Sequence, residues 1–250
     1  LESLLAHRPE QVLNVYFVEK QQGQNNAEAA ARLQRLLKQA RQVGVHTERV
    51  PAKTIEKWVG DQVHQGVAAE IRPVQALDEH DLMASVEVAT ASHVQGKHLL
   101  FLALDQVTDS HNLGACLRVA AAAGVAGVIL PKDKSAEINA VVRKVASGAV
   151  DVLNIYRVTN LARTLSQLKE KNLWVYGTLL DEQAQSLYQT DFKRDMVLVM
   201  GAEGSGLRRL TRDLCDGLLF IPMSGAVESL NVSVATGICL FEVLRYRQYA

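Results

Sequence analysis

The chain has little of several features that mark common protein classes. Among its 250 residues are only three cysteines, Cys116, Cys215 and Cys239, and they form no CxxC pair. Neither a disulfide framework nor a zinc site is expected, and we expect all three to be small buried core residues in a reducing cytosol. The longest uncharged stretch, residues 119–131, is too short to cross a bilayer, and the start shows no signal-peptide pattern. We therefore expect a cytoplasmic protein without membrane contact. Because the chain opens on Leu1 rather than Met, we also expect that some N-terminal sequence precedes it.

The chain also has no excess of charge of either sign. Lys and Arg number 27 and Asp and Glu number 27, so the formal net charge is zero. The distribution is uneven, however, because residues 75–95 contain acidic residues but neither lysine nor arginine. Two basic clusters lie elsewhere, namely Arg32, Arg35, Lys38 and Arg41 at helical spacing, and Arg208, Arg209 and Arg212. Either cluster alone is more typical of a solvated helix face than of a nucleic-acid site.

Several catalytic and binding motifs are absent. The histidines are scattered and no His, Cys or carboxylate set has metal-ligand spacing, so metal chemistry is not expected. A GxSxG nucleophile elbow is missing. Residues 201–206 order their glycines as GxxGxG, the reverse of the dinucleotide fingerprint, and no GK[ST] follows. A dehydrogenase and a P-loop nucleotidase are therefore both disfavoured.

The hydrophobic pattern predicts two α/β domains. In the N-terminal part, residues 12–18, 45–50 and 67–71 resemble strands and residues 27–40 resemble a helix. Pro73 and the acidic segment after it suggest a linker over residues 74–95, with a short helix at 82–90. We thus expect domains at 1–73 and 96–250.

The second domain shows continuous apolar runs separated by helical stretches. These runs are residues 98–104, 127–130, 173–176, 196–200 and 218–221. Such runs are typical of a mostly parallel sheet that is buried on both faces. Ligands of such sheets bind beyond the carboxyl ends of the strands. Loops 200–206 and 221–233 each follow an apolar run, so we expect them to lie side by side at the ends of neighbouring strands and to form a site.

Segment 105–118 combines a helix start with one charged residue in an apolar helix. Asn112 is well placed to cap the helix that follows. Arg118 lies one turn after Gly114, which suggests either an arginine reaching into a cleft or one that extends to solvent. The residues alone leave these alternatives open.

The two later loops also have ordinary explanations. Glu203, between glycines, is typical of a turn at a helix start, and Ser229 or Asn231 could cap a helix that runs to about residue 245 with Val232 and Cys239 on one face. A strand followed by Pro222, Met223 and a glycine, however, has the composition of a binding loop.

Together these three segments resemble the three signature motifs of the SpoU branch of the SPOUT methyltransferases. Residues 64–67, 115–118, 131–133 and 224–238 are further similar to the bacterial members that methylate guanosine ribose in 23S ribosomal RNA, so that the resemblance covers nearly the whole chain. One departure is Ser110, where many relatives carry proline.

The resemblance implies the fold, the partners and the site. It implies a parallel-sheet domain with a deep trefoil knot, a small N-terminal α/β domain like a ribosomal protein that binds RNA, and a homodimer with the active site at the subunit interface. It implies S-adenosylmethionine as cofactor, held by Met200, Gly201, Gly206, Ile221, Met223 and Leu230. It implies a catalytic set of Asn112, Arg118, Glu203, Ser229 and Asn231.

We expect positioning of the two reactants to contribute most to catalysis. A guanidinium is a poor proton acceptor near neutrality, so we expect Arg118 to pair with an RNA phosphate and orient the ribose hydroxyl. Its proton would pass to that phosphate, to water or to a transiently neutral arginine. The alternatives are a 2′-O-methyltransferase acting on transfer RNA and a ribosome-assembly factor that binds RNA without methylating it.

Overall fold

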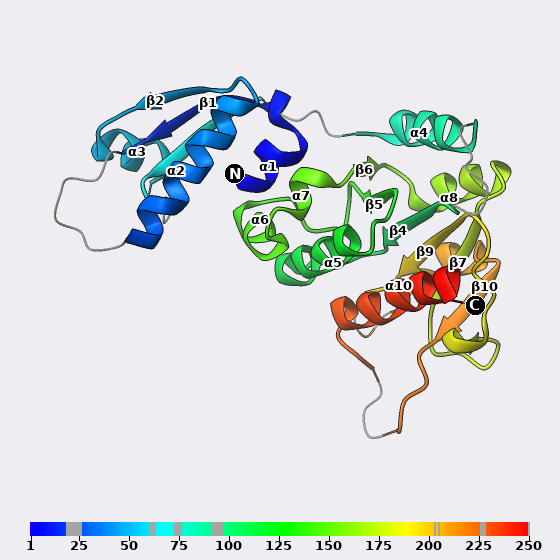
Figure 1. The fold of residues 1–250 in the computed structure, drawn as a ribbon. Coiled ribbons are helices and arrows are strands. Elements are labelled where there is room, and N and C mark those ends of the chain that lie inside the picture. The colour runs from blue at the N-terminus through cyan, green and yellow to red at the C-terminus, as the bar shows by residue number, and fades with distance from the viewer. Residues whose placement is uncertain are drawn as a thin grey trace. The chain divides into compact units, whose positions relative to one another are not determined.

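The computed structural model forms two compact units, Leu1–Gln75 and Ala76–Ala250, each with its own core (Figure 1). It describes residues 1–18, 27–60, 64–72, 77–91, 98–202, 204, 206–225 and 229–249. No helix in these ranges is both long enough and apolar enough to span a membrane.

The first unit is a small α/β domain. Its three-stranded sheet has the order β2-β1-β3, in which β1 (Val12–Phe17) pairs parallel with β2 (His46–Arg49) and antiparallel with β3 (Val67–Ile71). The helices are α1 (Glu2–His7), α2 (Ala27–Gln42) and α3 (Ala52–Val59), with a short 3₁₀ turn at Pro9–Gln11. The apolar side chains of β1 and α2 form a separate core with those of α1.

The second unit contains a seven-stranded sheet with the order β6-β5-β4-β9-β7-β10-β8, and every pair in it is parallel. Its strands are β4 (Leu100–Leu104), β5 (Gly127–Pro131), β6 (Ile155–Val158), β7 (Trp174–Thr178), β8 (Gln185–Ser186), β9 (Met196–Met200) and β10 (Gly217–Phe220). The expected mostly parallel sheet is therefore confirmed. Strands β6 and β8, at the two edges, were not predicted.

Helices cover both faces of this sheet. They are α4 (Glu79–Ala91), α5 (Ser110–Ala122), α6 (Ala140–Ala146), α7 (Ala149–Val152), α8 (Leu161–Glu170), α9 (Arg209–Asp213) and α10 (Val232–Tyr249). Alternate residues of each strand face opposite sides, so Leu102 packs with α5, α6 and α10, whereas Phe101 packs with α4 and α8. Burial on both faces explains why β4, β5 and β9 are apolar throughout.

The segment expected to be a linker is in part a core element. Leu82 and Val86 of α4 are fully buried against β4 and β6, and Leu77 forms a parallel bridge with Tyr156. The helix that we expected inside the linker therefore belongs to the second unit. Two of the cysteines, Cys116 and Cys239, are buried as expected, whereas Cys215 is only partly buried.

The expectation that loops 200–206 and 221–233 follow neighbouring strands is wrong. They follow β9 and β10, and β7 lies between these two strands in the sheet. The loops nevertheless reach the same place, because parallel strands have their carboxyl ends at one edge of the sheet. The end of β7 supplies the surface between them.

Candidate functional site

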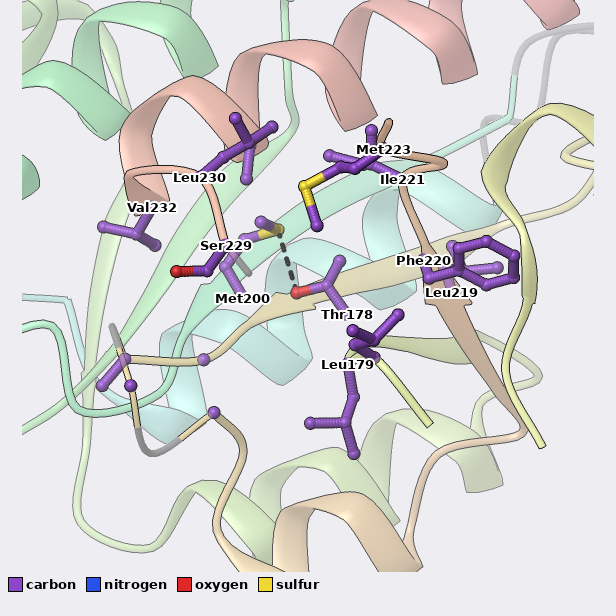
Figure 2. A pocket seen from close by; sticks show the side chains of 16 residues that line it. Thr178, Leu179, Met200, Leu219, Phe220, Ile221, Met223, Ser229, Leu230 and Val232 are labelled. Carbon is purple, nitrogen blue, oxygen red and sulfur yellow. Dashed lines mark hydrogen bonds between the residues drawn. The ribbon is translucent and has the colours of Figure 1, made fainter. Parts of the chain in front are cut away.

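One cavity of about 370 Å³ opens at this carboxyl edge (Figure 2). Its volume lies within the range of small-molecule sites. The walls come from the ends of β7, β9 and β10 and from the start of α10. The lining residues are Thr178, Leu179, Leu180, Met200, Gly201, Ala202, Gly204, Gly206, Leu219, Phe220, Ile221, Met223, Ser229, Leu230, Val232 and Ala235. The cavity is thus mostly apolar, with two side-chain hydroxyls and exposed backbone.

All six residues that we expected to bind the cofactor line this cavity: Met200, Gly201, Gly206, Ile221, Met223 and Leu230. The wall formed by Thr178, Leu179 and Leu180 was missed. The Thr178 hydroxyl donates to Val199 O at 3.3 Å and to Met200 Sδ at 3.6 Å, which ties β7 to β9 beside the cavity. A polar residue that ends a buried strand could have indicated this wall, since such residues commonly meet at the carboxyl edge.

The loop after β9 folds tightly on itself. Ala202 and Gly206 exchange backbone hydrogen bonds of 3.1 and 3.0 Å, and Gly206 has a φ of +65° that favours glycine. A Cβ on Gly201 would lie 2.3 Å from the carbonyl carbon of Gly206, so only glycine fits at the base of the loop. The tight fold requires glycine, and because Gly201, Gly204 and Gly206 line the cavity, backbone is exposed to it there. Glu203, predicted to be catalytic, lies outside the described residues.

Asn112 has a different local role from the one expected. The residue that caps α5 is Asp109, whose carboxylate accepts from Asn112 N at 2.8 Å. The Asn112 side chain instead accepts a hydrogen bond from Asn231 Nδ2, also at 2.8 Å. The capping interpretation of Asn112 is therefore wrong, and its side chain joins the start of α5 to the start of α10.

Of the two residues expected to cap α10, Ser229 and Asn231, it is Asn231 that bonds the first turn of the helix. Asn231 Oδ1 accepts from the backbone N of Ser233 at 2.9 Å and from its hydroxyl at 2.6 Å. Asn231 therefore uses its oxygen for the helix and its amide nitrogen for Asn112. Ser229, two residues earlier, lines the cavity.

Arg118 is exposed, and its side chain makes no hydrogen bond or ion pair within the part of the chain that the structure describes. The glycine one turn before it opens no cleft, because Gly114 is buried against α6, where a Cβ would lie 2.7 Å from that of Val145. Gly114 therefore permits close helix packing, and the guanidinium of Arg118 is available at the surface.

The basic cluster that follows the β9 loop is not a uniform charged face. Arg208 Nε lies 2.6 Å from the carboxylate of fully buried Asp105, and Arg212 is paired with Asp181 at 2.8 Å. Arg209 is exposed. The interpretation of this cluster as a solvated face therefore holds for one of its three arginines. In the first unit, Arg32 is paired with Glu2 at 2.9 Å.

No group of three or more metal-binding side chains occurs within the described ranges. The arrangement offers instead an apolar cavity with exposed backbone, and beside it the bonded side chains of Asn112 and Asn231. Such a site can hold a small organic molecule and present polar groups to a second reactant.

Comparison with known proteins agrees with this arrangement. Residues 99–241 match the SpoU rRNA Methylase family, and residues 1–77 match the family described as RNA 2'-O ribose methyltransferase substrate binding. The chain is 50% identical to the 23S rRNA (guanosine-2'-O-)-methyltransferase RlmB of Pseudomonas aeruginosa, over 99% of this chain and 94% of that protein. It is 48% identical to the protein of the same name from Pasteurella multocida, over 99% and 95%.

Solved structures show the same fold. The AdoMet-bound rRNA methyltransferase from Sinorhizobium meliloti superposes with a TM-score of 0.73 at 22% identity, covering 100% of this chain and 86% of that one. At this identity the likeness concerns the fold alone.

Proposed function

The chain belongs to the SpoU rRNA methylase family, and from this premise we propose that it transfers a methyl group from S-adenosylmethionine to the ribose 2′-hydroxyl of a guanosine in 23S ribosomal RNA. The observation that carries the proposal is the convergence of all six expected cofactor residues on one cavity. Relatives at 48% and 50% identity over nearly the whole chain bear the name of that activity.

The cavity suits S-adenosylmethionine in its shape and its chemistry. The glycine loop after β9 presents bare backbone to the cavity, since Gly201, Gly204 and Gly206 line it and have no side chains. Backbone N–H and C=O groups can pair with an adenine edge and with the amino-acid end of the cofactor, while Leu179, Ile221 and Leu230 can pack on the flat ring. The bound cofactor supplies an electrophilic methyl group.

We assign the acceptor side of the site, where the ribose 2′-hydroxyl that accepts the methyl group would bind, to the residues around the starts of α5 and α10. Asn112 and Asn231 hold each other at 2.8 Å, so both amides have fixed orientations before any RNA arrives. Ser229, at the cavity wall, lies on the same loop as Asn231. We assign these three residues and Glu203 to holding Arg118 and the target nucleotide.

We assign Arg118 to orienting the two reactants. A guanidinium is in general a poor proton acceptor, and its planar fork suits an RNA phosphate. Paired with that phosphate it holds the 2′-hydroxyl in line with the methyl group, and the proton leaves to the phosphate, to water or to a transiently neutral Arg118. Arg118→Lys keeps the charge and removes the fork, so we expect turnover at neutral pH to fall about 10²-fold or more. Near-normal turnover by this variant would contradict the role.

The active enzyme is assigned as a homodimer. Residues 232–241 of α10 include no charged side chain, and Val234 and Phe241, seven residues apart and so on one face, are 52% and 50% exposed. A second copy of the chain would cover this face and bring its own groups near the acceptor side. The family resemblance supports this assignment.

The path of the C-terminal segment is assigned as a deep trefoil knot. Strand β9 lies between β4 and β7, although β7 comes earlier in the chain. This order is compatible with a threaded path, which general rules of topology disfavour, so the assignment depends on the family. An experimental chain trace that reduces to an unknotted line would refute it.

We assign the first unit to RNA docking. It matches the family of substrate-binding domains, and single-stranded RNA is commonly bound by small α/β domains with basic side chains. Arg32, Arg35 and Arg41 on α2 are all exposed, although Arg32 pairs with Glu2 and Arg41 donates to Thr47 Oγ1. Removal of residues 1–75 should weaken RNA binding and leave cofactor binding intact, as measured by filter binding and calorimetry. Unchanged RNA affinity would contradict the docking role.

The overall proposal is tested in two steps. Titration calorimetry with S-adenosylmethionine should show one site per chain. Mapping of 2′-O-methyl groups in RNA from cells that lack the protein should then show one guanosine of 23S RNA unmodified. Loss of a methyl group from transfer RNA would favour that substrate, and no lost methyl group would favour a binding-only factor.

A further inference from the structure

A buried carboxylate lies next to the cofactor loop and is not used by the proposed reaction. Asp105 directly follows β4 and is 0% exposed, although it carries a formal charge. Charged side chains are rarely fully buried unless they are paired and hydrogen-bonded. The contacts of Asp105 therefore indicate what it holds in place.

Three hydrogen bonds of Asp105 reach the same segment of chain. The Asp105 N–H donates to Met200 O at 2.8 Å, at the last residue of β9. Its carboxylate accepts from Arg208 N at 3.1 Å and from Arg208 Nε at 2.6 Å. Met200 and Arg208 are the residues on either side of loop 201–207. Asp105 thus holds both ends of the loop that lines the cavity.

The same residue begins the loop that leads to the acceptor side. Asp105 stands seven positions before Asn112 and thirteen before Arg118 in the chain. Gln106, next to it, has a φ of +65°, a conformation that is uncommon outside glycine, so the chain turns sharply there. A movement of Asp105 would therefore change the cofactor loop and the acceptor loop relative to each other.

We propose that Asp105 and Arg208 form a positioning pair that fixes the glycine loop of the cofactor cavity against the loop carrying the acceptor-side residues. The inference deepens the proposed function and rests on it. The pair acts through the backbone of residues 201–207 and does not itself touch the methyl donor. Since a displacement of about 1 Å in a reacting pair can change a rate by about 10²-fold, a mispositioned loop should affect both binding and turnover.

The test uses Asp105→Asn, Arg208→Met and the double variant, with Arg209→Met as the matched control. Arg208→Met keeps the aliphatic stem and the backbone N–H, so it removes only the guanidinium. Arg209 is the next residue and is exposed. Thermal unfolding and circular dichroism establish that each variant is folded.

The first readout needs no ligand. We expect the backbone amides of residues 200–208 to exchange with deuterium at least tenfold faster in both single variants than in the wild type and in Arg209→Met. The second readout is affinity. We expect the Kd for S-adenosylmethionine to rise about tenfold in each single variant. In the double variant the Kd should be no higher than in whichever single variant binds the cofactor less tightly. The KM for this cofactor should rise with it, and kcat should fall.

The affinity for a second ligand, 5′-methylthioadenosine, is measured as well. This ligand lacks the amino-acid part of the cofactor, so it distinguishes positioning of the loop by Arg208 from direct contact between Arg208 and that part of the cofactor. A positioning pair predicts that Arg208→Met weakens both ligands by a similar factor. Loss of affinity for S-adenosylmethionine alone would show that Arg208 binds the cofactor carboxylate directly and would overturn the proposal. Unchanged amide exchange with both Kd values within twofold of the wild type would also overturn it. If the wild type bound neither ligand, the proposed function would fail, and the exchange measurement would still decide whether the pair holds the loop.

Discussion

The substitution Gly201→Ala tests the close approach at the base of the cofactor loop. The new Cβ would lie 2.3 Å from Gly206 C, 2.5 Å from Gly206 O and 2.7 Å from Leu207 N. All three are backbone atoms, so no side chain can rotate away. Because carbon atoms prefer a separation of about 3.5–4.0 Å, the two ends of the loop must separate by roughly 1 Å or more.

This displacement determines how much stability and cofactor affinity the substitution should cost. The two hydrogen bonds between Ala202 and Gly206 join residues at or next to the overlap, and their loss would lower the free energy of unfolding by about 2 kcal/mol. The cavity wall shifts by the same distance, so we expect the affinity for S-adenosylmethionine to fall at least tenfold and kcat/KM by about 10²-fold. Calorimetry and steady-state methylation of an RNA fragment measure the two quantities.

Gly204→Ala is the matched comparison in the same loop. Gly204 has a φ of +77°, but a Cβ added there would have no atom within 4 Å, so alanine at this position is strained without overlap. This strain should lower stability by about 1–2 kcal/mol, and the affinity should fall less than in Gly201→Ala. If Gly201→Ala binds the cofactor as the wild type does, or if Gly204→Ala weakens binding more, the overlap does not control the cavity.

Three further results are expected from other parts of the fold. Phe241→Asp should convert the dimer to monomers in analytical ultracentrifugation, whereas Val88→Asp, at a 70% exposed position of α4, should not; a dimeric Phe241→Asp would exclude this face of α10. Arg247→Met should lower the free energy of unfolding in urea by about 2–4 kcal/mol, because the guanidinium donates to four backbone carbonyls; a loss as small as that of exposed Arg209→Met would contradict this role. Burial raises the pKa of the Cys239 thiol to about 12, so Cys239 in the folded protein should resist iodoacetamide at pH 8, and rapid labelling there would show that the thiol is not enclosed. Because the thiol ionises more readily in the unfolded chain, the free energy of unfolding should be unaffected by this group below the ordinary thiol pKa and should fall as the pH rises from about 9 towards 12.

Sequence patterns predicted the buried strands of the second unit because burial on both faces leaves a continuous apolar run. Strand β6 was not predicted because it lacks such a continuous apolar run. It alternates buried and partly buried residues, and its partly buried Arg157 donates to the carbonyls of Lys132 and Ala136. A four-residue edge strand with a charged side chain has no run to detect. The order of the strands was equally hidden, since β9 enters the sheet between β4 and β7.

The site could be predicted where it depends on backbone shape and not where it depends on pairing between distant loops. Glycine at position 201 is a local requirement, because a Cβ there would overlap the backbone of Gly206. The bond between Asn112 and Asn231 joins residues 119 positions apart, and a local pattern cannot show it. The capping hypothesis for Asn112 failed because two residues near the start of α5 could serve as its cap. Asp109 takes that role, and so leaves the Asn112 amide to orient Asn231 at the start of α10. The cap supplied by Asp109 is therefore the local condition for a long-range contact between the two helices that border the acceptor side. The choice of Asp109 over Asn112 as the cap of α5 thus leaves the Asn112 side chain available to bond the start of α10.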